Sequence, residues 1–208
     1  MTDHNIVTSI VLVGGKSSRL GKSKALEIVG GRSLIQRVIE RLMPLSCHII
    51  VAGSTWQPGF PSAPDIEYKL DLYPEKGPLG GIYTGLLVSK SFYNLVVACD
   101  MPFLNVDLLR YMLKLCPGLD AVIPFTDRIQ PLHGVYAKSC LDDIRTGLDK
   151  DWLKIVPFLN TVTVRYVTKE ECQRFDPQLL SFLNINSPID LAQANVLVAG
   201  EKAGVNYS

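Results

Sequence analysis

Short apolar runs rich in β-branched residues alternate along this chain with segments of helical periodicity, and this alternation restricts the possible folds most strongly. The run IVTSIVLV (6–13) ends at a glycine pair, and NLVVACD (94–100) ends on an acid. Runs that are apolar at consecutive positions are typical of strands buried on both faces, as in a parallel sheet covered by helices. The sequence therefore predicts an α/β protein with a doubly wound, mostly parallel sheet.

Helical periodicity is clear in SLIQRVIERLMPL (33–45), which begins with a serine that can cap a helix. Asn105 or a neighbour is expected to cap the helix over 106–115 in the same way. Further strands are expected at 47–53, 66–70, 120–124, 132–137 and 161–167, further helices near 80–89, at 138–149 and from Pro188, and short apolar segments at 152–159 and 181–186.

Length and charge restrict the domain organisation and the partners. The 208 residues contain no repeat or linker, so we expect a single domain over 1–208. The 21 Lys and Arg residues balance 20 Asp and Glu, which gives no field that favours nucleic acid or an anionic membrane. The first residues match neither a signal peptide nor a membrane span. Five cysteines without zinc spacing indicate reduced, mostly buried thiols in a cytoplasmic protein.

The stretch GGKSSRLGKSK (14–24) follows the first predicted strand and is nearly a phosphate-binding P-loop. A P-loop needs four residues between its first glycine and Gly-Lys-Ser, but five separate Gly15 from Gly21 here. Glycines that expose backbone N–H groups and four cations within nine residues would still suit a triphosphate. An exposed basic turn between strand and helix is the alternative. The four cations are Lys16, Arg19, Lys22 and Lys24.

Two acids stand where a parallel sheet presents its ligands. Asp100 ends the run 94–100, and Asp71 begins the glycine-rich stretch DLYPEKGPLGGIYTGL. Ligands of α/β sheets bind beyond the carboxyl ends of the strands, and Mg²⁺ with a nucleotide is usually held by one or two carboxylates. Asp100 could instead be a solvated strand end or a helix cap.

Other catalytic patterns are missing from the sequence. It has no G-x-S-x-G elbow and no G-x-G-x-x-G dinucleotide fingerprint, which argues against hydrolase and dehydrogenase chemistry. The three histidines lack metal-ligand spacing. We expect His133, in QPLHGVY, to face a cleft or to form local hydrogen bonds rather than to bind a metal.

Five blocks of the sequence together resemble the molybdenum cofactor guanylyltransferases, a family of nucleotidyltransferases. They occur in the family's order over almost the whole chain: VLVGGKSSRLGKSK (11–24), DLYPEKGPLGGIYTGL (71–86), VVACDMPFL (96–104), QPLHGVYAKSC (130–140) and NINSPIDL (184–191). The first block alone is similar to the wider nucleotidyltransferase superfamily. The double glycine is typical of the guanylyl branch, since cytidylyl and uridylyl relatives usually have Ala-Gly there.

The resemblance implies a Rossmann-like fold of the nucleotide-diphospho-sugar transferase type that uses Mg²⁺ and transfers GMP from GTP to molybdenum-loaded molybdopterin. A GTP-binding accessory protein and molybdoenzyme apoproteins are further partners of such an enzyme. The implied site residues are Leu12, Val13, Gly14 and Gly15 beside guanine and ribose, Arg19 and Lys24 at the phosphates, Asp71 at the nucleotide, Asp100 at Mg²⁺, and Asn184 and Asn186 near the cofactor and metal.

The chain departs from the family pattern at several positions. Val13 replaces the usual alanine, Leu20 the usual methionine, and Ser23 the usual aspartate before the lysine. Similarity is weak over 141–180, where acceptor specificity could differ. The alternatives are therefore a cytidylyltransferase of the same fold acting on this cofactor or on a sugar or polyol phosphate, a non-catalytic nucleotide-binding delivery module, and a P-loop GTPase.

The expected reaction is an attack of an acceptor phosphate oxygen on the α-phosphorus, with pyrophosphate leaving. Positioning and charge neutralisation supply most of the catalysis in such transfers. A phosphate nucleophile is already ionised near neutral pH, so no general base is required. This accounts for the lack of an obvious catalytic histidine in the sequence.

Overall fold

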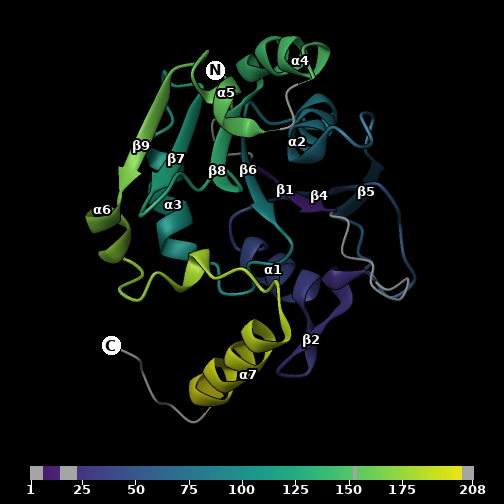
Figure 1. Ribbon diagram of the computed structural model, residues 1–208, viewed down its shortest axis with the longest axis vertical. Helices are drawn as coiled ribbons and strands as arrows, with labels where there is room; N and C mark the ends of the chain where they lie inside the picture. Colours follow the sequence, from purple (N-terminus) through teal and green to yellow (C-terminus); the bar gives the residue numbers. More distant parts are fainter. Residues whose placement is uncertain (1–6, 15–22, 152–153, 203–208) are drawn as a thin grey trace.

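The computed structural model describes residues 7–14, 23–151 and 154–202, and it contains a seven-stranded sheet in the order β5-β4-β1-β6-β8-β7-β9 (Figure 1). Strands β5, β4, β1 and β6 are parallel, β8 is antiparallel to both of its neighbours, and β7 is parallel to β9. The strands are β1 (Thr8–Val13), β4 (His48–Gly53), β5 (Ile66–Leu70), β6 (Tyr93–Ala98), β7 (Ala121–Phe125), β8 (His133–Ala137) and β9 (Val164–Thr168). The predicted α/β class and the mostly parallel sheet are confirmed.

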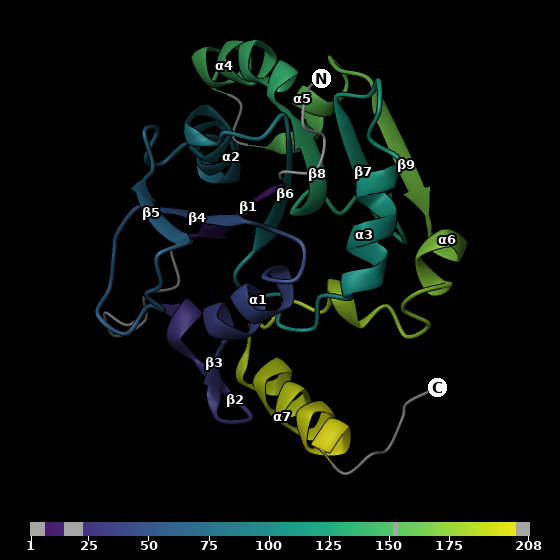
Figure 2. The same ribbon diagram turned by 180° about the vertical axis from the view of Figure 1, so that it is seen from behind.

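Helices cover both faces of the sheet, with α1 and α3 in front of it in Figure 2. The helices are α1 (Leu34–Leu42), α2 (Gly77–Val88), α3 (Val106–Lys114), α4 (Leu141–Asp149), α5 (Ile155–Leu159), α6 (Lys169–Gln173) and α7 (Pro188–Lys202), with 3-10 turns η1 (Lys24–Leu26), η2 (Lys138–Cys140) and η3 (Leu180–Phe182). Successive residues of β1 point to opposite faces, so that Ile10 packs in the α2 and α4 core and Val11 in the α1 and α3 core.

The expected caps form as the side chains suggest. Ser33 accepts a hydrogen bond from Gln36 N at the start of α1, and Asn105 accepts one from Leu108 N at the start of α3. The glycines of α2 allow that helix to pack closely, because a Cβ on Gly80 would lie 2.8 Å from Tyr73 O and one on Gly85 would lie 2.5 Å from Ile10.

Several boundaries differ from the sequence-based prediction. The apolar run at 181–186 begins in the turn η3 and continues without a regular element, and β9 begins at Val164 rather than at 161. The short hairpin of β2 (Ile28–Val29) and β3 (Arg32–Ser33) and the helix α6 were not predicted from the sequence. The two-residue strands of the hairpin are too short to produce a periodic pattern.

The C-terminal helix α7 packs below the sheet against the β2–β3 hairpin, as both ribbon views show (Figures 1 and 2). Val29, Leu34 and Val198 form part of the apolar cluster that joins them. The chain between η3 and α7 passes along the sheet edge, where Ile185 N donates to Asp100 O at 3.0 Å. This crossing brings the last block of the sequence to the ends of the central strands.

The structure agrees with the predicted state of the cysteines. All five cysteines are free, and four are buried while Cys47 is exposed, as the reading of mostly buried thiols requires. Within the described residues, none of the helices combines the length and the hydropathy that a membrane crossing requires.

Candidate functional site

The candidate site lies at the sheet edge where the central parallel strands end. β1 ends at Val13, β4 at Gly53, β5 at Leu70 and β6 at Ala98. Backbone bonds extend the ladder past these ends, from Cys99 N to Leu12 O at 3.1 Å and from Asp71 N to Gly53 O at 2.9 Å. Both predicted acids therefore leave the sheet at this edge, as expected for ligand sites of parallel sheets.

Three predicted site residues meet directly at this edge. Lys24 Nζ lies 2.7 Å from Asp100 Oδ2 and donates to Asn186 Oδ1, also at 2.7 Å. The Lys24 and Asp100 side chains are only 17% and 19% exposed. At such partial burial a charged hydrogen bond is stronger than on an open surface, so the carboxylate and the ammonium orient each other.

A capped turn holds Lys24 in this position. Ser23 Oγ accepts from Ala25 N at the start of η1, and Ser23 N donates to Gln57 Oε1 at 2.9 Å. A serine at this position thus performs the capping that an aspartate could perform. The departure of Ser23 from the family pattern therefore leaves the turn that carries the lysine intact.

Asp190, which was not among the predicted site residues, fixes the position of Asn186. Its Oδ2 accepts from Asn186 N at 2.8 Å and from Ser187 N at 2.7 Å, while Ser187 Oγ accepts from Asp190 N. The bond from the Asn186 backbone is the main cause that lowers the pKa of Asp190, and Lys24 contributes. The spacing Ser187-x-x-Asp190 is a capping-box pattern and was a usable signal in the sequence.

The second carboxylate oxygen of Asp100 has no hydrogen-bond partner among the described residues. Asp100 Oδ1 is buried and accepts no hydrogen bond from the described residues. A buried, unpaired carboxylate oxygen is costly, and a hard cation such as Mg²⁺ or a ligand donor would satisfy it. Among the described residues there is no group of three or more His, Cys, Asp or Glu that could hold a metal ion.

Asp71 occupies a second position along the same edge. Its Oδ1 accepts from Tyr73 N at 2.9 Å and from Thr84 Oγ1 at 3.1 Å, and Thr84 in turn accepts from Leu72 N. These bonds tie the segment after β5 to α2. Asp71 therefore has a structural role here in addition to the nucleotide contact that the resemblance implies, and that contact stays a prediction.

The remaining predicted residues differ in how the structure places them. Leu12 and Val13 are each 8% exposed and pack into opposite cores, so a nucleotide could reach mainly their backbone. Gly14 is exposed, and Asn184 donates to Phe182 O at 3.2 Å instead of joining the Lys24 cluster. Gly15 and Arg19 lie outside the described residues.

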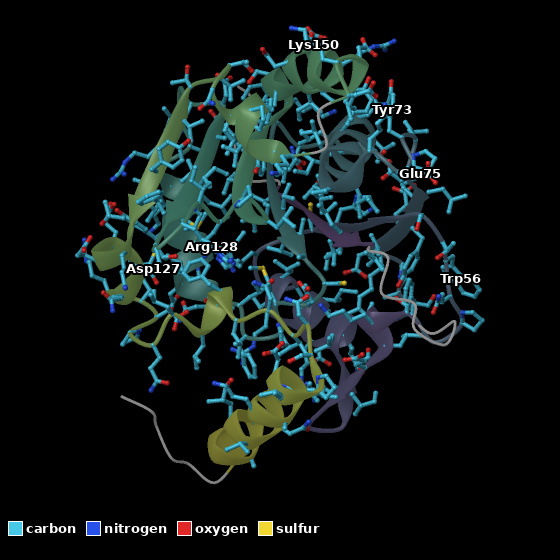
Figure 3. All side chains as sticks on the ribbon, in the orientation of Figure 1. Trp56, Tyr73, Glu75, Asp127, Arg128 and Lys150 are labelled. Carbon is cyan, nitrogen blue, oxygen red and sulfur yellow. The ribbon has the colours of Figure 1, made fainter. Side chains whose placement is uncertain are left out.

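An apolar pocket of about 180 Å³ lies beside the ends of β1, β4 and β5. Val13, Gly53 and Leu70 line it together with Trp56, which Figure 3 shows on the outer side of this region. Pockets for whole small molecules usually measure about 300–1,000 Å³, so this one has room for part of a ligand.

Two potentially reactive side chains near the edge, Cys99 and His133, are neutral near pH 7. Burial raises the pKa of the Cys99 thiol to about 12, and the adjacent Asp100 carboxylate acts in the same direction. Burial lowers the pKa of His133 to about 3, so its imidazole is neutral near pH 7. The His133 ring is fully buried, lies 4.8 Å from the Phe182 ring, and has neither nitrogen bonded to a described residue. The expectation that it faces a cleft or bonds locally is therefore wrong, because apolar packing encloses it.

Known proteins are similar to this chain over most of its length. The chain is 34% identical over 198 residues to a probable molybdenum cofactor guanylyltransferase of Pelotomaculum thermopropionicum, with 95% of this chain and 96% of the relative covered. A solved structure, molybdopterin-guanine dinucleotide biosynthesis protein A from Archaeoglobus fulgidus, superposes with a TM-score of 0.77 at 28% identity, over 92% of this chain and 98% of the other.

A more distant solved structure shares the fold alone. It is the 4-diphosphocytidyl-2C-methyl-D-erythritol synthase of Anaerococcus prevotii, with a TM-score of 0.68 at 16% identity over 95% of this chain and 100% of the other. The model of the MobA-like NTP transferase domain matches residues 9–166, which include Lys24, Asp71 and Asp100. The chain therefore belongs to the family of MobA-like NTP transferase domains.

Proposed function

We propose that this protein transfers GMP from GTP to the phosphate of molybdenum-loaded molybdopterin and releases pyrophosphate. The relatives that carry the name molybdenum cofactor guanylyltransferase match over most of the chain. The observation that carries the proposal is the cluster of Lys24, Asp100 and Asn186 at the carboxyl edge of the sheet. It places a cation, an open carboxylate oxygen and an amide where α/β proteins bind their ligands.

In this proposal Lys24 stabilises the negative charge that builds on the departing pyrophosphate. The charge of its ammonium is directed at the edge of the sheet in a partly buried setting, where electrostatic stabilisation is stronger than in water. Arg19 acts beside it on the phosphates, as the family resemblance implies. Asp71 contacts the nucleotide with the carboxylate oxygen that the loop and helix bonds leave available.

Asp100 holds Mg²⁺ in this proposal, because its Oδ1 is the open carboxylate oxygen of the cluster. When bound, the metal supplies positive charge beside the nucleotide phosphates. Asn186 keeps Lys24 beside Asp100, and the Asp190 cap keeps Asn186 in place.

The chemistry needs no protein nucleophile or general base. An oxygen of the acceptor phosphate forms a bond to the α-phosphorus while the bond from that phosphorus to the pyrophosphate oxygen breaks. The acceptor phosphate is ionised near neutral pH, so no proton must be removed. The high pKa of Cys99 and the enclosed position of His133 agree with direct transfer.

A cytidylyltransferase of the same fold is the nearest alternative, since a distant neighbour of that kind shares the architecture. The glycine pair at 14–15 favours GTP over CTP by resemblance. We place the reaction in the cytoplasm, where free thiols persist, and a GTP-binding accessory protein and molybdoenzyme apoproteins are the proposed downstream partners.

The test incubates the purified protein with Mg²⁺, molybdenum-loaded molybdopterin and either labelled GTP or labelled CTP. We expect a product with the mass of the guanine dinucleotide and one pyrophosphate released for each product formed. A cytosine product would establish the cytidylyl alternative. Release of GDP and phosphate would indicate a GTPase, and binding of GTP without turnover would indicate a delivery module. The same assay applied to Asp100→Asn tests the role of that carboxylate. Asp107→Asn, on the exposed first turn of α3, is its matched control.

A further inference from the structure

The loop over residues 126–130, between β7 and β8, ends beside the strand that carries Asp100. Val97 pairs with His133, and Ala98 N donates to Leu132 O at 3.1 Å. Because this pair is antiparallel, the residues just before Leu132 run alongside those just after Ala98. The loop 126–130 therefore stands at the same edge as the Lys24 cluster, on the side away from β4 and β5.

Internal bonds give this loop a fixed shape. Thr126 N donates to Arg128 O and Gln130 N donates to Pro124 O, while the Gln130 amide reaches Thr126 Oγ1 at 3.2 Å. Asp127 forms an ion pair with Lys169 of α6 at 2.9 Å. The loop is thus held from inside and anchored to the neighbouring helix.

Arg128 at the tip of this loop carries an uncompensated charge. Its side chain is exposed, and no residue in the described ranges forms an ion pair or hydrogen bond with its guanidinium. Its neighbour Asp127 is already engaged by Lys169. In Figure 3 Arg128 is labelled left of the centre, whereas Trp56 and Tyr73 are labelled at the right.

The C-terminal segment connects this loop to the Lys24 cluster. The Phe182 ring packs on His133, Ile185 N bonds to Asp100 O, and Asn186 accepts from Lys24. Residues 182–186 thus connect the start of β8, just after the 126–130 loop, with Lys24. A ligand lying along this segment would have Lys24 at one end and the loop at the other.

We infer that Arg128 is a specificity-determining residue that binds the acidic phosphate of the acceptor. This inference rests on the proposed function. Transfer requires the phosphates of two anionic substrates to approach each other, and Lys24 is committed to the Asp100 side of the site. A guanidinium presents a planar pair of donors that matches a phosphate, so an arginine on the acceptor side offsets the repulsion and orients the nucleophile.

The test compares wild type, Arg128→Ala and Arg128→Lys in binding of two fluorescent probes, oxidised molybdopterin and the same pterin after removal of its phosphate. Wild type should prefer the phosphorylated probe, and Arg128→Ala should lose about tenfold affinity for it while binding the dephosphorylated probe as wild type does. Arg128→Lys should retain part of the preference. Arg110→Ala, an exposed arginine on α3, is the control and should behave as wild type.

Binding of GTP with Mg²⁺ to the same variants separates the possible failures. We expect it to be unchanged in Arg128→Ala, with a higher KM for molybdopterin. An equal loss of GTP affinity, or a preserved preference for the phosphorylated probe in Arg128→Ala, would overturn the role of Arg128. Wild type that binds both probes equally would also overturn it. Wild type that binds the phosphorylated pterin through Arg128 but makes no guanine dinucleotide would instead refute the proposed function and leave the binding role standing.

Discussion

The two halves of the sheet, one on each side of β6, place different structures at the edge where the Lys24 cluster lies. On one side β5, β4 and β1 run parallel and simply end there, at Leu70, Gly53 and Val13, beside an apolar pocket. On the other side β8 runs antiparallel between β6 and β7, so that a connecting loop, 126–130, stands at the edge. Asp100 leaves β6 at the boundary between the halves.

In the proposed reaction this difference would separate the binding of the two substrates. The ends of the parallel strands and the glycine-rich start of α2 offer backbone groups, and the apolar pocket lies beside them. Both features would suit a nucleotide. The inserted antiparallel strand provides a loop whose side chains can vary without altering the parallel core, which suits recognition of an acceptor. The cluster of Lys24, Asp100 and Asn186 lies at the boundary between the two halves.

The largest effect is expected at the boundary, from Asp100→Asn. Loss of the negative charge should reduce transfer by about 100-fold or more, the usual scale for removing a preorganised electrostatic group. Higher Mg²⁺ should restore part of the activity, because an amide retains one oxygen ligand. Titration of Mg²⁺ against GMP transfer in both proteins checks this. If Asp100 serves only to orient Lys24, an asparagine oxygen can still accept from the Lys24 ammonium and the two Mg²⁺ curves should coincide.

Lys24→Ala should come next, with transfer reduced by at least about tenfold because about 1.4 kcal/mol of charge stabilisation is lost. GTP binding and turnover should be measured on protein whose circular dichroism matches wild type. Lys24→Arg, which keeps the charge, should retain more activity than Lys24→Ala. Unchanged turnover in a folded Lys24→Ala protein would transfer the role to Lys22.

Asp71 tests the nucleotide half with a smaller effect on turnover. Asp71→Asn keeps an oxygen that can accept from Tyr73 N and Thr84 Oγ1, so its melting temperature should stay close to that of wild type while GTP affinity falls. Asp71→Ala removes both bonds and should cost about 1–3 kcal/mol of unfolding free energy as well. Calorimetry on both variants decides. A large stability loss in Asp71→Asn without weaker GTP binding would leave Asp71 only its structural role.

The smallest effect near neutral pH is expected for the stability of the half that contains β8, at His133. Burial lowers its pKa to about 3, so between about pH 6.5 and 3 the unfolded chain binds a proton that the folded chain does not. Stability from this group is therefore fully present above the unfolded pKa and is lost as the pH falls through this window. His133→Leu should flatten the fall of melting temperature between pH 7 and pH 4.

The matched control for that experiment is His48→Gln, at the partly exposed start of β4 in the other half. This comparison separates the loss of a buried imidazole from the loss of a partly exposed one. An acid dependence in His133→Leu identical to wild type would mean that the folded protein opens to protonate His133 at no measurable cost.

Local patterns in the sequence were sufficient for much of the fold. The caps at Ser33 and Asn105 and the strand at 66–70 follow from side-chain chemistry and apolar periodicity within a few residues. The antiparallel direction of β8 could not be inferred in this way, because a buried strand has the same apolar pattern in either direction. The cap at Asp190 was readable from Ser187-x-x-Asp190 and was overlooked.

Composition and spacing within short blocks were sufficient for the α/β class and the family resemblance, and they named the candidate site residues. Only the tertiary structure decided which of them meet. Lys24 is separated by 76 residues from Asp100 and by 162 from Asn186, yet its ammonium touches both. The tertiary structure also left Asn184 out of that cluster and packed the His133 ring against Phe182. Such contacts depend on strand order and on the path of the C-terminal segment across the edge, which form as burial of the whole core is optimised and which no local pattern specifies.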